Sequence, residues 1–168
     1  HLRLTVNTAK SAVARPCDRK FLGFSFTNGR APKRRIAPQA LLRFKAKITE
    51  LTRSAKGANL AQGAQALSRY LTGWRGYFGF CETPSVLRSL DKWIRRRLRA
   101  IVWRQWKRGR TRFAELRRRG IGRDLAAQTA GSAHGPWRLS KSPALNIAVS
   151  NAYLSSLGLV SLAPRPPA

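Results

Sequence analysis

Apolar residues recur three and four positions apart in three consecutive stretches of the chain, which is the spacing of one face of an α-helix. Pro38, Asn59 and Pro84 favour the beginning of a helix, and each stands at the start of one stretch. The three apolar stripes are Leu41, Phe44, Ile48, Leu51 and Ala55; Leu60, Ala64, Leu67, Leu71, Trp74 and Phe78; and Leu87, Leu90, Ile94, Leu98, Ile101 and Gln105. We therefore predict three amphipathic helices whose stripes pack into a bundle.

Glycine follows the first and third predicted helices, at Gly57 and Gly109, where it is a common terminator. Gly73, Gly76 and Gly79 would each cost about 1 kcal/mol relative to alanine inside the second helix. We expect either the close approach of another backbone at these glycines or a helix that ends near Gly79.

The N-terminal part of the chain has the pattern of a small β element. Residues 2–6 alternate between apolar and polar, and the aromatic-rich residues 20–27 are typical of a strand. Asn28-Gly29 is a strong hairpin signal, so residues 34–36 are expected to return as the partner strand.

The C-terminal part has weaker periodicity. We expect a short helix over 113–119, an irregular segment over 120–142, and a helix that starts at Ser142-Pro143 and stops at Gly158. Its inward residues are expected to be Leu145, Val149, Ala152 and Leu157. The predicted fold is thus mainly α: a three-helix bundle with a small N-terminal β-hairpin element and a C-terminal helical extension. The predicted division is 1–36, 37–119, 120–162 and a disordered tail, 163–168.

Charge indicates the kind of partner. The 168 residues include 34 Lys and Arg against 6 Asp and Glu, a formal net charge of +28. Solvated surfaces ordinarily mix both signs, so this excess favours a polyanion, either DNA or RNA. A basic amphipathic helix can also lie on an anionic membrane, but the regular stripes favour burial within a bundle.

The predicted third helix has a basic and aromatic second face. Trp74 falls on an apolar stripe and is assigned to the core, whereas Trp93, Trp103 and Trp106 form either a second packing face or nucleic-acid contacts. Arginine binds phosphate through a planar fork, and aromatic rings stack on bases. The candidate RNA-binding residues are Arg88, Lys92, Arg95, Arg96, Arg99, Trp103, Arg104, Trp106, Lys107 and Arg108, with Lys33, Arg34 and Arg35 beside the hairpin as second choices.

The usual constellations of catalytic residues are not evident. The six acidic residues are scattered singly, and the two cysteines and two histidines show no metal-binding spacing. We therefore predict no catalytic residues, metal site or cofactor in this chain. Asp91 is expected to form surface ion pairs with Arg88 and Arg95, and the low cysteine content suits a reducing compartment.

Four segments, in order, resemble the C-terminal part of bacterial group II intron-encoded reverse transcriptases/maturases. Residues 2–13, LRLTVNTAKSAV, and 21–26, FLGFSF, resemble the last two blocks of the reverse-transcriptase palm; the second is the primer grip, here Phe21, Leu22, Gly23 and Phe24. Residues 69–108 resemble the maturase-specific thumb, domain X, and residues 135–162 resemble the end of that domain.

The resemblance implies that the chain binds group II intron RNA to assist splicing and grips an RNA/DNA template–primer duplex. The full-length family is an RNA-directed DNA polymerase, whose Mg²⁺-binding aspartates have no counterpart here and would lie upstream. Because the sequence begins at His1 and has no methionine, we expect a fragment. The expected location is the bacterial cytoplasm, in association with nucleic acid. The alternative is a stand-alone basic nucleic-acid-binding bundle, and the oligomeric state stays open.

Overall fold

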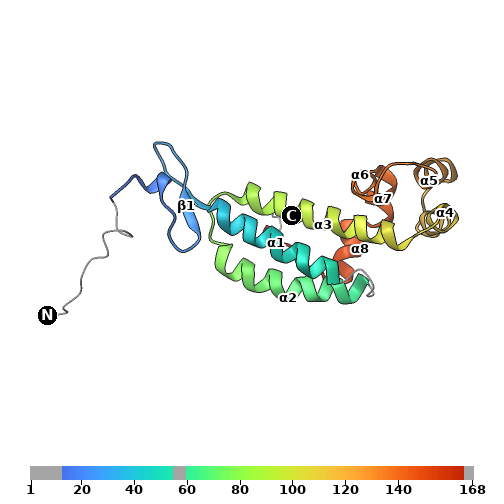
Figure 1. Cartoon of the computed structure of the whole chain (residues 1–168), viewed down its shortest axis with the longest axis horizontal. Coiled ribbons are helices and arrows are strands. Elements are labelled where there is room, and N and C mark those ends of the chain that lie inside the picture. The colour runs from blue at the N-terminus through green and yellow to red at the C-terminus, as the bar shows by residue number, and fades with distance from the viewer. Residues whose placement is uncertain (1–12, 55–59, 165–168) are drawn as a thin grey trace.

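Three long helices lie side by side in the middle of an elongated molecule, with a β-hairpin at one end and short helices at the other (Figure 1). The computed structural model describes residues 13–54 and 60–164. The strand expected over 2–6 lies outside these residues, as do Ala55, Gly57, Asn59 and the end of the tail. The mainly α architecture with a small N-terminal hairpin is confirmed.

The three central helices are α1 (Pro38–Ser54), α2 (Leu60–Phe78) and α3 (Pro84–Gln105). Their predicted stripes form the core: Phe44, Ile48, Leu67, Leu71, Leu87, Ile94 and Leu98 are buried. Each such side chain contributes about 1.5–3 kcal/mol by leaving water. Trp74 is in this core as predicted, 4.4 Å from Phe44 between ring centroids. Gln105, at the end of the third stripe, is exposed instead.

The glycines of α2 have a different explanation from close packing. A Cβ added at Gly73 or Gly76 would meet no atom within 4 Å, so another backbone does not approach there. The alternative expectation, a helix that ends near Gly79, is correct: α2 ends at Phe78, and the Gly79 amide donates to the carbonyl of Arg75 at 2.7 Å.

The hairpin pairs β1 (Phe24–Phe26) with β2 (Arg34–Ile36), antiparallel, with Ser25 opposite Arg35. A short 3-10 helix, η1 (Pro16–Asp18), precedes it. The connection is longer than the predicted two-residue turn at Asn28-Gly29: Thr27 and Lys33 close it, since the Thr27 amide donates to the Lys33 carbonyl at 2.9 Å. The expected strand over 20–27 is also interrupted, because residues 21–24 form a tight turn of their own.

The C-terminal part contains α4 (Gly109–Arg118), α5 (Arg123–Ala130), α6 (Pro136–Leu139), α7 (Pro143–Ala148) and α8 (Asn151–Ser156). The expectation of an irregular segment over 120–142 was wrong. The buried face of α5 consists of Ala126, Thr129 and Ala130, and such small residues leave a weak hydrophobic period. Gly109, expected to stop the third helix, begins α4 instead, because α3 already ends at Gln105.

The helix expected from Ser142 to Gly158 is divided in two. Ser142 caps α7 as predicted, by accepting from the Leu145 amide. Ser150 caps α8 by accepting from the Tyr153 amide, and this second cap restarts the helix in a new direction. Leu154 is therefore buried, and Ala152, expected to point inward, is exposed.

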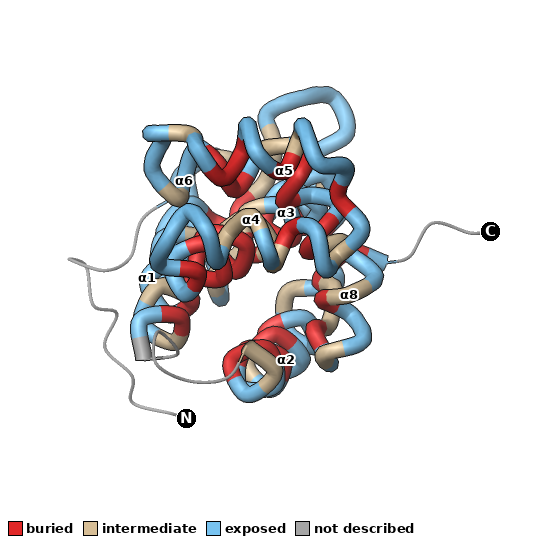
Figure 2. Tube along the Cα trace, turned by 90° about the vertical axis from the view of Figure 1, so that its right-hand side faces the viewer, coloured by how far each residue is buried: buried red, intermediate tan, exposed pale blue. Residues whose placement is uncertain are grey.

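The short helices cover the far half of α3 and form a second part of the core. Figure 2, which looks at this end of the molecule, shows that the buried positions of α4 and α5 lie between helices and the exposed positions lie outside. Leu116, Ile121, Ala126, Leu145 and Val149 are buried here together with residues of α3. The second face of α3 is consequently a packing face over much of its length.

Candidate nucleic-acid interface

Two of the three tryptophans that the sequence left as possible nucleic-acid contacts, Trp103 and Trp106, are inside the molecule, whereas Trp93 is half-buried. Trp103 is 0% exposed and Trp106 is 8% exposed, with 6.0 Å between their ring centroids. Arg112 lies over the Trp103 ring at 4.7 Å, and Arg119 lies over Trp106 at 5.5 Å. Their assignment to the RNA-binding face was wrong, because the short helices fold back onto this side of α3. Of the two alternatives left open for them, the packing face is correct.

The basic residues of α3 differ in exposure along its length. Arg88, Lys92 and Arg104 are exposed, as are Lys107 and Arg108 in the turn to α4. These five remain available to a partner. Arg95 and Arg96 are half-buried, and Arg99 is buried.

A basic hollow lies between α3 and the segment that contains α6, α7 and α8. It has a volume of about 470 Å³ and its lining includes no acidic residue. Its lining residues are Lys92, Arg95, Arg96, Arg99, Ser140, Lys141, Asn146 and Asn151. Four of the predicted residues are therefore brought together in one concave site, and a fifth cation, Lys141, joins them from the C-terminal segment.

Arg99 is the buried member of the basic hollow, 8% exposed. Its Nε donates to the Val149 carbonyl at 2.9 Å, and its Nη2 donates to Asn151 Oδ1 at 3.0 Å. Burial, and secondarily the charge of Arg95, lowers the pKa of Arg99. Both acceptors are neutral, so the geometry of this guanidinium is fixed while its charge is not neutralised.

Arg96 covers one ring of the C-terminal segment. Its guanidinium lies 3.8 Å from the centroid of Trp137 and donates to the Trp137 carbonyl at 2.9 Å and to Ser140 Oγ at 3.3 Å. Trp137 is still 41% exposed. An exposed indole beside a fixed guanidinium is the arrangement on which a nucleobase can stack.

Asp91 does not form the predicted surface ion pairs. It is 5% exposed and accepts hydrogen bonds from Ser161 Oγ at 2.6 Å, the Leu162 amide at 2.9 Å and the Ala163 amide at 3.0 Å. None of the ion pairs among the described residues involves it. Its role is to hold the end of the C-terminal segment on α3.

The four residues assigned to the primer grip form a tight turn. The Phe21 and Phe24 amides each donate to the other residue's carbonyl at 2.9 Å, and Leu22 and Gly23 have φ of 48° and 79°. A positive φ at both central positions matches the right-handed twist of a hairpin. Tyr77 of α2 donates to the Leu22 carbonyl at 2.8 Å, so the turn is attached to the bundle while Phe21 and Leu22 face solvent.

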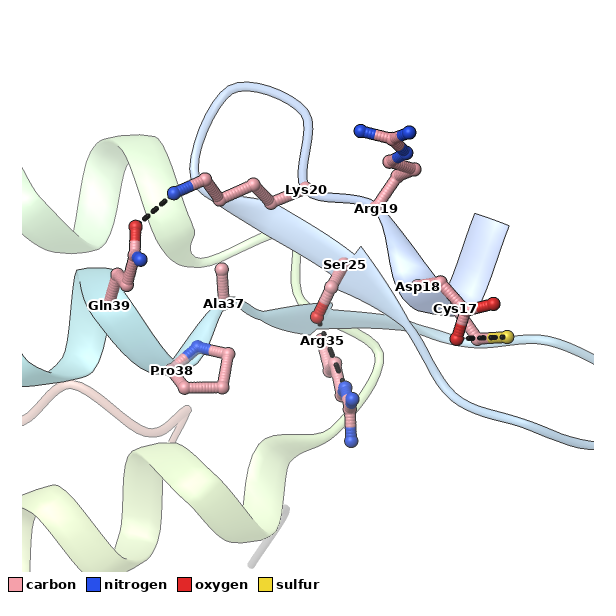
Figure 3. Close-up of a pocket in the computed structure, with 9 residues that line it drawn as sticks. All are labelled: Cys17, Asp18, Arg19, Lys20, Ser25, Arg35, Ala37, Pro38 and Gln39. Atoms are coloured by element: carbon pink, nitrogen blue, oxygen red, sulfur yellow. Dashed lines mark hydrogen bonds between the residues drawn. The ribbon is translucent and has the colours of Figure 1, made fainter. Parts of the chain in front are cut away.

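The second-choice basic residues belong to the hairpin rather than to the basic hollow. Lys33 is exposed; the Arg34 amide donates to Glu82 Oε2 at 2.6 Å; and Arg35 Nε donates to Ser25 Oγ at 3.1 Å. Figure 3 shows a second hollow between η1, the hairpin and the start of α1, with Lys20 bonded to Gln39 and Arg35 to Ser25. Its lining includes an acidic residue, Asp18, so its charge is mixed.

Five residues of the interface were not among the predictions: Trp137, Ser140, Lys141, Asn146 and Asn151. Trp137 and Lys141 lie within residues 120–142, where the weak hydrophobic periodicity indicates neither a helix nor a binding site. The Asn146 amide group donates to the Lys141 and Ser142 carbonyls, which orders this edge of the hollow. The signal in the sequence for this part of the interface was the tryptophan and the lysine that precede the predicted helix start at Ser142-Pro143.

Within the described ranges, no group of three or more His, Cys, Asp and Glu could hold a metal ion. No described helix has both the length and the apolar character required to cross a membrane. The residues of the interface can contact a partner through cations, amide groups and an exposed indole ring.

Comparison with known protein families gives a match to the group II intron, maturase-specific domain over residues 41–120. This range covers nearly all of the three-helix bundle and α4, and includes the basic residues of α3. A search of curated proteins gave no match.

Proposed function

We propose that this chain, whose residues 41–120 match the group II intron maturase-specific domain, is part of a group II intron maturase that binds intron RNA to assist splicing and grips the RNA/DNA template–primer duplex. The observation that supports this proposal best is the basic hollow, whose lining includes Lys92, together with the exposed cations Arg88 and Arg104 elsewhere on α3. All of these charges except that of Lys141 lie on α3, within the matched family domain. We place this activity in the bacterial cytoplasm.

The chemistry of the interface suits RNA. Arginine and lysine bind phosphates, and asparagine amides can reach 2′-hydroxyl groups. A structured RNA is recognised mostly through its backbone and shape, which agrees with an interface of cations and few exposed aromatic rings. The turn at residues 21–24, at the other end of the bundle, is the part we assign to the primer strand.

A double charge reversal tests the proposed contact face. We expect Arg88→Glu with Lys92→Glu to reduce affinity for structured group II intron RNA by at least tenfold at fixed salt, because two phosphate contacts become repulsive. The matched control is Arg43→Glu with Lys45→Glu on α1, which changes the net charge equally at two other exposed positions. Equal losses in both variants would contradict a specific face, and no binding by the unmodified protein would contradict the function.

Salt dependence provides the second readout of the same experiment. If about six phosphates are neutralised, affinity falls roughly a thousandfold between 50 and 200 mM salt. The neutral pair Arg88→Gln with Lys92→Gln should then lower the salt slope by about two, as one ion-pair contact is lost at each position. A slope unchanged from the original protein would show that these side chains do not touch phosphate.

A further inference from the structure

The burial of Arg99 leaves a positive charge without a counter-ion. All six acidic side chains of the sequence lie in the described residues, and none of the ion pairs found there involves Arg99. A buried charge is costly unless it is paired, and the two neutral acceptors of Arg99 satisfy its geometry without cancelling its charge. The folded chain therefore holds a fixed, desolvated guanidinium at the edge of an open hollow.

The surroundings of Arg99 increase this cost. Arg95, Arg96, Lys92 and Lys141 line the same hollow, and all carry the same sign. Among the described residues, Arg95 donates to a neutral hydroxyl, Ser161 Oγ, at 3.5 Å. Five cations that converge on a concave site of about 470 Å³ repel one another unless an anion occupies it.

The two sides of the hollow come from distant parts of the chain. The α3 side supplies four cations, and residues 140–151 supply Lys141, Asn146 and Asn151. Arg99 already joins the two sides through the Val149 carbonyl and Asn151. Arg96 joins them as well, through the Trp137 carbonyl and Ser140 Oγ. An anion in the hollow would add a further connection, between the cations of α3 and Lys141.

We propose that the basic hollow is a binding site for an internal phosphodiester group of an RNA strand, anchored by Arg99, and that this phosphate stabilises the packing of the C-terminal segment on α3. The inference rests on the proposed function, because it specifies which chemical group of the RNA enters this part of the interface. The size of the hollow suits a phosphate with part of its sugar, and the exposed ring of Trp137 beside Arg96 can take the neighbouring base.

Thermal unfolding of the full chain tests the site without RNA. Inorganic phosphate is the probe, compared with chloride at equal ionic strength. At ten times its dissociation constant, phosphate should raise the midpoint by roughly 3–6 °C. Arg99→Gln should lose this increment, whereas Arg123→Gln, an exposed arginine of α5 outside the hollow, should keep it. Equal increments in both variants would overturn the site, because they would reflect a general salt effect.

A second variant covers the case in which Arg99→Gln does not fold. Lys141 is exposed, so Lys141→Gln should fold normally and still remove one cation from the hollow. We expect it to reduce the phosphate increment by about half and the affinity for RNA about threefold to tenfold, with a salt slope lower by about one. An unchanged increment, affinity and slope would overturn the proposal.

RNA binding separates failure of this inference from failure of the proposed function. If the protein binds intron RNA but Arg99→Gln and Lys141→Gln bind as tightly as Arg123→Gln, the hollow is not the phosphate site and the proposed function stands. If the unmodified protein does not bind RNA, the proposed function fails, and the thermal shift with phosphate still decides whether the hollow binds the anion.

The source of the phosphate is decided by two oligonucleotides of one sequence, one with a 5′-phosphate and one with a 5′-hydroxyl. An internal phosphodiester predicts that Arg99→Gln and Lys141→Gln weaken the binding of both equally. Weakening that is confined to the 5′-phosphorylated strand would show a terminal monoester site and overturn the proposed internal contact.

Discussion

At the scale of single residues, burial sorts side chains of the same type into different roles. Arg99 and Arg104 are five positions apart on α3, yet Arg99 is buried against the C-terminal segment and Arg104 is exposed. Trp103 is buried, and no described residue accepts a hydrogen bond from its indole N–H, while Trp137 keeps an exposed ring. The chemistry of a residue type therefore indicates a role only together with its burial.

Leu22 is the residue at which backbone strain is clearest. Its φ is 48°, a left-handed conformation that costs a non-glycine residue about 1–2 kcal/mol, and its side chain is 66% exposed. Such strain persists in folded proteins chiefly at functional sites. The position agrees with the proposed primer-grip role, in which an exposed apolar side chain is displayed at a fixed turn.

Leu22→Gly should stabilise the protein. Glycine adopts a positive φ without steric cost, and little buried surface is lost, so we expect the free energy of unfolding to rise by about 1 kcal/mol. The measurement is urea denaturation of the variant and the original protein. Leu22→Ala is the control, since it removes the same side chain but keeps the Cβ that causes the strain. A gain in the alanine variant equal to that in glycine would show that the side chain, rather than the backbone, is responsible.

At the scale of elements, two contacts attach the ends of the chain to the bundle. Asp91 of α3 holds residues 161–163, and Glu82, in the turn between α2 and α3, holds the hairpin. In both cases a carboxylate accepts from backbone amides of an element that is distant in sequence. These two acids form long-range backbone contacts, in a protein with only six acids.

Asp91→Asn should weaken the attachment of the C-terminal segment. The carboxylate of Asp91 now accepts three hydrogen bonds, whereas the NH2 group of asparagine would face one of these donors and leave it without an acceptor. We therefore expect the free energy of unfolding to fall by about 2–4 kcal/mol. Denaturant unfolding measures the loss, with Asp124→Asn on the exposed side of α5 as the control. A cost equal to that of the control would mean that Asp91 is dispensable for packing.

The attachment of the hairpin should depend on pH. The Arg34 amide donates to the Glu82 carboxylate and, as the largest cause, lowers the pKa of Glu82 below its ordinary value; the Arg34 side chain adds to this effect at 3.6 Å. A depressed folded pKa means that the carboxylate stabilises the fold fully above the ordinary glutamate pKa of about 4.3, and that this contribution is lost as pH falls through the folded pKa.

Comparison of the original protein with Glu82→Gln tests this pH dependence. We expect the original protein to have the higher thermal midpoint at pH 6, and the difference to shrink steadily below about pH 4 as the carboxylate is protonated. Glu50→Gln on α1 serves as the reference for a change of one charge at an exposed glutamate. A difference that does not vary with pH would show that ionisation of Glu82 does not hold the hairpin.

At the scale of the whole molecule, the excess of positive charge is arranged rather than uniform. The net charge of +28 opposes compaction, and the apolar stripes of the bundle overcome this repulsion in the middle of the molecule. The electrostatic repulsion that remains is concentrated where cations converge, in the basic hollow. A polyanionic partner would reduce this repulsion, so binding at the hollow would also stabilise the fold.

The central helices were predictable because their signals are local. The stripe from Leu87 to Ile101 and the start at Pro84 depend on residues within one helix, and the structure reproduces both. The start of α7 at Ser142-Pro143 was predictable for the same reason. In the hairpin the strand β2 was correct, whereas the turn at residues 21–24 is held by Tyr77 of α2, a contact that no local pattern reveals.

The sequence by itself thus determined the bundle, its apolar stripes and the excess charge that points to a polyanion. Only the tertiary structure determined what the second face of α3 contacts. Trp103 and Trp106 lie in the core, Asp91 is buried and holds the C-terminal segment, and Arg99 is the buried member of the basic hollow. The reason is physical. An amphipathic helix specifies which face is apolar, but whether its other face meets water or protein depends on a segment more than 30 residues away folding back onto it.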